Sequence, residues 1–103
     1  MRMASRLTLH EELCTILTTR NAYFQPPMSV QMKYPAIVYS LGDMRKLHAN
    51  DGMYKPLVAY EVTLIDEDPD SELVSKILAL PYCTFNRFYP ADNLNHWVFT
   101  LYY

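Results

Sequence analysis

Apolar side chains recur at helical spacing in the first twenty residues of the chain. They return every three or four positions, at Leu9, Leu13, Ile16 and Leu17. This spacing predicts a helix over residues 5–19 with one apolar face turned to the core. Ser5 is a residue type that caps helix starts, and Glu11 and Glu12 lie toward the opposite, solvent-facing side.

Later segments have the alternating pattern or the composition of β-strands. The four predicted strands cover residues 36–41, 57–65, 82–89 and 94–102. In the second of these, Tyr60 and its alternate neighbours are apolar, whereas Glu61 and Thr63 mark a face that is at least partly wet. A shorter extended piece is expected at residues 23–24, ahead of two prolines that stop it.

A second helix is predicted over residues 69–80. Asp68 suits the cap of this helix, and Pro69 suits its first helical position. Pro81 is expected to stop it. The buried face is expected to contain the apolar side chains Leu73, Val74, Ile77, Leu78 and Leu80.

The predicted elements follow the order α-β-β-β-α-β-β along 103 residues, a length that fits one domain. Half of the residues are hydrophobic and 19% are charged, which is the composition of a folded chain. We therefore expect residues 1–103 to form a single α+β domain. Its sheet should be mainly antiparallel, with two helices packed on one face.

Two segments carry apolar side chains that suit contact with another protein. Residues 42–56 are expected to form a protruding hairpin or long loop, because Asn50, Asp51 and Gly52 have turn chemistry. Aromatic residues also continue to the end of the chain, so the last strand must pack inside the domain or against a neighbouring subunit. The candidate interface residues are Met44, Arg45, Leu47, Met53, Tyr54, Trp97, Tyr102 and Tyr103.

Charge and composition argue against several classes of protein. The net charge is −2 and the basic residues are scattered, which disfavours tight nucleic-acid binding by the monomer. No apolar run approaches membrane-spanning length, and the N-terminus lacks the apolar core of a secretory signal. We therefore expect synthesis in a reducing cytoplasm, with Cys14 and Cys83 both free.

The acidic stretch after the third predicted strand alternates like a set of calcium ligands, at Asp66, Asp68 and Asp70. A helix–loop–helix calcium loop needs a glycine at its sixth position and a glutamate at its twelfth. Ser71 and Ile77 occupy those positions. The stretch is therefore interpreted as a helix start, and no metal site is predicted.

No other constellation predicts a catalytic or cofactor site. The three histidines fall on three different elements, and none has a second ligand at metal-binding spacing. Cys83 and His96 could sit on adjacent strands as a thiol and its base, but no third residue is in place to orient them. The nine tyrosines suit core and interface contacts better than stacking on nucleic acid, because a matching basic groove is missing.

Motif-like stretches run through both halves of the chain. They are Asn21-Ala22-Tyr23-Phe24-Gln25-Pro26-Pro27, Met32-Lys33-Tyr34-Pro35-Ala36-Ile37-Val38-Tyr39, Tyr60-Glu61-Val62-Thr63-Leu64-Ile65-Asp66, Asp68-Pro69-Asp70-Ser71, Leu80-Pro81-Tyr82-Cys83, Phe85-Asn86-Arg87-Phe88-Tyr89 and the run from Asp92 to Tyr103. As an ensemble they resemble the small tail terminator, or tail completion, proteins of long-tailed bacteriophages and prophages. The resemblance covers nearly the whole chain.

The resemblance implies a helix–sheet–helix–sheet fold and a ring, expected to be hexameric, that caps the tail tube. Such a ring meets the tube protein and a head-side connector or stopper protein, and DNA passes through its hole without sequence-specific binding. The resemblance also implies a place at the head-proximal end of the virion tail after assembly in the bacterial cytoplasm, with no cofactor, no catalytic residues and no membrane. Two other interpretations stay open: a head–tail joining protein of the phage, and a small cytosolic enzyme or nucleic-acid-binding module.

Overall fold

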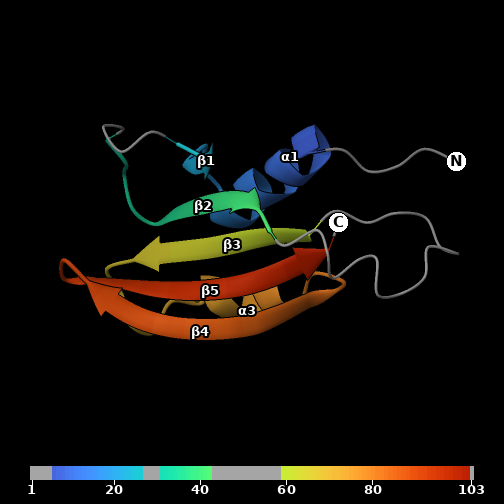
Figure 1. Cartoon of the computed structure of the whole chain (residues 1–103). Coiled ribbons are helices and arrows are strands. Elements are labelled where there is room, and N and C mark those ends of the chain that lie inside the picture. Colours follow the sequence, from blue (N-terminus) through green and yellow to red (C-terminus); the bar gives the residue numbers. More distant parts are fainter. Residues whose placement is uncertain (1–5, 27–30, 43–58, 103) are drawn as a thin grey trace, which may run out of the picture.

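The computed structural model describes residues 6–26, 31–42 and 59–102 (Figure 1). These residues form two helices and five strands. In chain order they are α1 (Arg6–Leu17), β1 (Ala22–Phe24), β2 (Ala36–Leu41), β3 (Ala59–Asp66), α3 (Leu73–Leu78), β4 (Cys83–Ala91) and β5 (Leu94–Tyr102). The order α-β-β-β-α-β-β and the α+β class are therefore confirmed.

The five strands form one sheet in the order β1-β2-β3-β5-β4. Strand β1 runs parallel to β2, and every other neighbouring pair is antiparallel. The pairings align side chains in rows that cross the whole sheet. One row is Ala22, Ile37, Leu64, Trp97 and Phe88. Two residues further along β1, on the same face of the sheet, the row is Phe24, Tyr39, Val62, Phe99 and Phe85.

The core lies between the two helices and the face of the sheet that carries these two rows of side chains. Helix α1 contacts β1 and β2, and α3 contacts β4, so together they cover the sheet from one side (Figure 1). Every second residue of β3 and β5 points into the core, as their alternation predicts. The buried cluster includes Leu9, Leu13, Leu17, Ile37, Tyr39, Val62, Leu64, Ile77, Trp97, Phe99 and Leu101.

Helix α1 ends two residues earlier than the sequence predicts. Thr18 has a φ of 60°, in the left-handed region that ends many helices. Beyond it, both terminal guanidinium nitrogens of Arg20 donate to the Glu11 carboxylate at 3.1 Å. This pairing lowers the pKa of Glu11 and raises that of Arg20. The predicted start at Ser5 lies outside the described residues.

Helix α3 is much shorter than the predicted span of residues 69–80, which was wrong at both ends. The side chain of Asp66 accepts the backbone N–H of Asp68, and the side chain of Asp68 accepts that of Asp70. These local bonds give the backbone a turn instead of a helix. The Asp68 carboxylate therefore caps a turn, and the helix begins only at Leu73. Leu78, expected on the buried face, is 41% exposed.

Strands β4 and β5 form a hairpin with a two-residue turn. Asp92 and Asn93 have φ values of 54° and 63°, as a type I′ turn requires. The strand therefore continues through Pro90 to Ala91, past the predicted end at Tyr89. A β-bulge between Phe85 and Arg87 shifts the register by one residue.

The predicted hairpin or loop over residues 42–56 falls almost wholly outside the described residues. The same holds for most of the candidate interface: Met44, Arg45, Leu47, Met53, Tyr54 and Tyr103.

Candidate interaction surface

Strand β4 is the most exposed element of the sheet. It lies at an edge, and seven of its nine residues fall in the exposed class. Tyr82, just before the strand, is 70% exposed, Phe85 is 48% exposed, Phe88 is 46% exposed and Tyr89 is 38% exposed. Large aromatic side chains left in water on one edge are typical of a surface that another molecule covers. We call these four residues the β4 surface.

The bulge determines where two of these aromatic side chains point. Residues 85 and 88 are three apart, so a regular strand would place them on opposite faces. The extra residue Asn86 brings both onto the helix side of the sheet. There the Phe85 ring lies 5.8 Å from that of Phe99, and the Phe88 ring lies 5.5 Å from that of Trp97. The two rings therefore extend the core outward to the sheet edge.

The opposite face of the sheet carries a polar and aromatic layer. Arg87 reaches across β5 toward Glu61, with 3.8 Å between Nη2 and Oε2. It also lies over the Tyr89 ring, which stacks on His96 with centroids 4.6 Å apart. Val98, which pairs with Arg87 on this face, is fully buried.

Of the interface residues named from the sequence, the described part of the chain contains Trp97 and Tyr102. Trp97 belongs to the buried cluster and is 9% exposed. It packs inside the domain and has little surface left for a partner. Tyr102 is half-buried at the end of β5, beside Tyr82, whose carbonyl accepts its backbone N–H.

The thiol and imidazole of Cys83 and His96 do not come together. Cys83 pairs with Leu101, whereas His96 pairs with Tyr89 near the other end of the hairpin. The two side chains also lie on opposite faces of the sheet, because Cys83 packs against the core. Burial raises the pKa of the Cys83 thiol, which favours its neutral form. The structure therefore gives no support to a thiol–base pair here.

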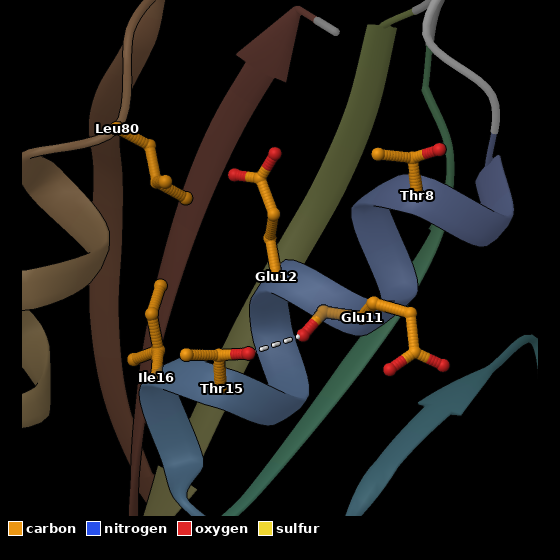
Figure 2. Close-up of a pocket in the computed structure, with 6 residues that line it drawn as sticks. All are labelled: Thr8, Glu11, Glu12, Thr15, Ile16 and Leu80. Atoms are coloured by element: carbon orange, nitrogen blue, oxygen red, sulfur yellow. Dashed lines mark hydrogen bonds between the residues drawn. The ribbon is translucent and has the colours of Figure 1, made fainter.

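A hollow of about 320 Å³ lies between α1 and Leu80, the second residue after α3 (Figure 2). Its polar groups are largely engaged elsewhere. The Thr15 hydroxyl donates to the Glu11 carbonyl at 2.9 Å, and the Glu11 carboxylate, which turns away from Leu80, pairs with Arg20 (Figure 2). No nucleophile and base converge on the hollow among its lining residues.

The described ranges contain neither a metal-ligating cluster nor a membrane-spanning helix. No group of three or more histidine, cysteine, aspartate or glutamate side chains there is arranged to hold a metal ion. Neither described helix has the length and apolar character needed to cross a bilayer.

Phe85 and Phe88 are not among the interface residues expected from the sequence. Residues three positions apart in a regular strand lie on opposite faces, so the sequence pattern does not predict that these two side chains share a face. Only the bulge at Asn86 makes them neighbours. The signal that was available is the density of aromatic residues in the segment from Tyr82 to Tyr89.

Comparison with models of known families, with curated protein sequences and with solved structures finds no match to this chain.

Proposed function

We propose that this chain is a structural protein of a long-tailed bacteriophage, a tail terminator that assembles as a ring, expected to be hexameric, at the head-proximal end of the tail. Its partners are copies of itself, the tail tube protein and a head-side connector or stopper protein. DNA passes through the hole of the ring.

The observation that carries this proposal is the β4 surface. Along one edge of the sheet, a large aromatic area is exposed to water on Tyr82, Phe85, Phe88 and Tyr89. Aromatic side chains dominate the buried centres of protein interfaces, because they cover a large area at low entropic cost. This arrangement suits a protein whose activity is assembly, and it agrees with the element order that the resemblance implies.

Deletion of the gene from the phage or prophage that carries it tests the proposal. We expect filled heads and tails that fail to join, as seen by negative-stain electron microscopy. The unaltered gene supplied in trans should restore infectious particles. Intact, infectious particles after deletion would overturn the proposal.

Matched variants make the rescue experiment specific. Phe88→Lys places a charge on the β4 surface and should rescue at least tenfold less well than the unaltered gene. Leu7→Lys makes the same kind of change at a residue that is 66% exposed on α1 and should rescue fully. Location of the chain on the head side of the joint, instead of on the tail, would point to a head–tail joining protein.

A further inference from the structure

The two outermost strands of the sheet are β1 and β4. In the described ranges, each of them pairs with a neighbour along one side only. The outer side of an edge strand presents backbone N–H and C=O groups that can form hydrogen bonds with a strand of another molecule. Within the described part of the chain, the sheet therefore has two edges that can accept a strand.

The hairpin geometry shows which part of β4 is available. In a two-residue hairpin the residues flanking the turn, Ala91 and Leu94, exchange backbone bonds with each other. Alternate residues then face β5, so Phe88 and Pro90 turn their backbone groups to the outer edge. Pro90 has no N–H to donate. Strand addition is therefore limited to the part of β4 that ends at Phe88.

The two edges run in opposite directions. Strand β1 is parallel to β2, β3 is antiparallel to β2, β5 is antiparallel to β3, and β4 is antiparallel to β5. Thus β1, β2 and β5 run one way, and β3 and β4 run the other way; Figure 1 shows the alternating arrows of β2, β3, β5 and β4. When copies are repeated by rotation about an axis along the strands, the β4 edge of one copy meets the β1 edge of the next in antiparallel orientation.

We infer that β4 of one copy pairs with β1 of the next, so that the sheet continues from subunit to subunit around the ring. The inference rests on the proposed ring and names its contact. A head-to-tail contact between two different edges is the kind that closes into a ring. Pairing of β4 with a second β4 is self-complementary and stops at a dimer.

The rows of the sheet show which side chains this contact brings together. Continued without stagger, they place Phe88 beside Ala22 of the next copy and Phe85 beside Phe24. A small residue then faces one exposed ring, and an aromatic residue faces the other. Such cross-strand aromatic pairs stabilise sheets. The exposed rings of Phe85 and Phe88 then lie beside residues of β1 of the neighbouring copy.

Disulfide trapping tests the contact. On the face without helices, Tyr23, Val38, Thr63, Val98 and Arg87 form one row. The double variant Tyr23→Cys/Arg87→Cys therefore places one thiol on each edge, at the spacing of directly opposite residues. Both side chains lie outside the core, and far-UV circular dichroism with an unfolding curve checks that the variant folds.

The expected result is a ladder on a non-reducing gel, from dimers up to a closed ring, after mild oxidation of concentrated protein or of isolated tails. Each single variant should give no ladder beyond the background of Cys14 and Cys83. Absence of the ladder from both samples would overturn the inference. A strong dimer of the Arg87→Cys variant that is linked through residue 87 of both copies would also overturn it, because that product requires β4 to pair with β4.

The same experiment separates this inference from the proposed function. A ring imaged on tails that gives no ladder leaves the tail role intact and rejects the β4–β1 contact. A ladder from purified protein, with no copies of the chain on tails, supports the contact and rejects the tail role.

Discussion

The ring of Phe85 meets that of Phe99 edge-on, with centroids 5.8 Å apart and an angle of 73° between the planes. Phe99 is fully buried, whereas Phe85 is 48% exposed. This pair marks the point where the core of the domain reaches its surface. Aromatic side chains pack the sheet against its helices, and at the β4 edge they are thus also exposed to a neighbouring molecule.

Truncation of these two rings should have very different effects on the monomer. Phe99→Ala should lower the free energy of unfolding by about 3–5 kcal/mol, because it leaves a cavity in the core. Phe85→Ala should lower it by about 1 kcal/mol, since half of the ring is already in water. Urea unfolding followed by the fluorescence of Trp97, the only tryptophan, measures both values. Equal losses would mean that Phe85 belongs to the core.

The hairpin turn gives a second prediction. Asn93 has a φ of 63°, which a β-branched residue adopts only with strain. Asn93→Val should therefore lower the free energy of unfolding by about 1–2 kcal/mol. Asn93→Gly should stay within about 0.5 kcal/mol of the unaltered protein, since glycine adopts this conformation freely. The reverse ranking in urea unfolding would argue against a type I′ turn.

Stability should fall at alkaline pH because of buried tyrosines. Burial raises the pKa of both Tyr39 and Tyr60 above the ordinary value of 10.0. The folded state therefore disfavours the phenolate, so their contribution is fully present below pH 10 and is lost as the pH rises above it. Denaturant midpoints measured from pH 8 to 11 should show this decline.

Tyr39→Phe is the matched control for this pH dependence. At neutral pH it should cost about 1 kcal/mol, because it removes the hydroxyl that lies 2.7 Å from His10 Nδ1. Above pH 10 its stability should fall less steeply than that of the unaltered protein, since one titrating phenol is gone. An unchanged slope would show that Tyr39 does not contribute to the alkaline transition.

The ion pair between Arg87 and Glu61 should contribute little to folding. Its side chains are 56% and 45% exposed, so water screens the attraction. A double-mutant cycle with Arg87→Ala and Glu61→Ala should give a coupling of about 0.5 kcal/mol at low salt. The coupling should vanish in about 1 M NaCl. A coupling that resists salt would indicate a more buried pair than the geometry suggests.

The sequence predicted most of the fold because its strands alternate clearly. Tyr60, Val62 and Leu64 lie on the buried face as expected, and Glu61 and Thr63 are half-buried on the other. The predicted bounds of β2 and β5 agree with the structure. Alternation is reliable here because each of these strands has one face against the core.

Local side-chain chemistry explains where the sequence misled. Asp68 and Pro69 look like a helix start, but the carboxylate of Asp68 bonds to the backbone of Asp70 and stabilises a turn. Hydrophobic periodicity does not predict the bulge at Asn86. The strand pairing in the structure is therefore what places Phe85 and Phe88 on the same face of the sheet. The structure thus adds β4 as a candidate surface, whereas the predicted loop at residues 42–56 lies almost wholly outside the described residues.

The central claim is that other protein molecules cover the β4 surface within a phage tail. A reconstruction of the head-proximal tail end at side-chain resolution, from the phage whose genome carries this chain, tests it most directly. We predict a closed ring of this chain in which Phe85 and Phe88 are buried between neighbouring copies. A tail end that lacks the chain, or a ring in which both phenylalanines face solvent, would contradict the account.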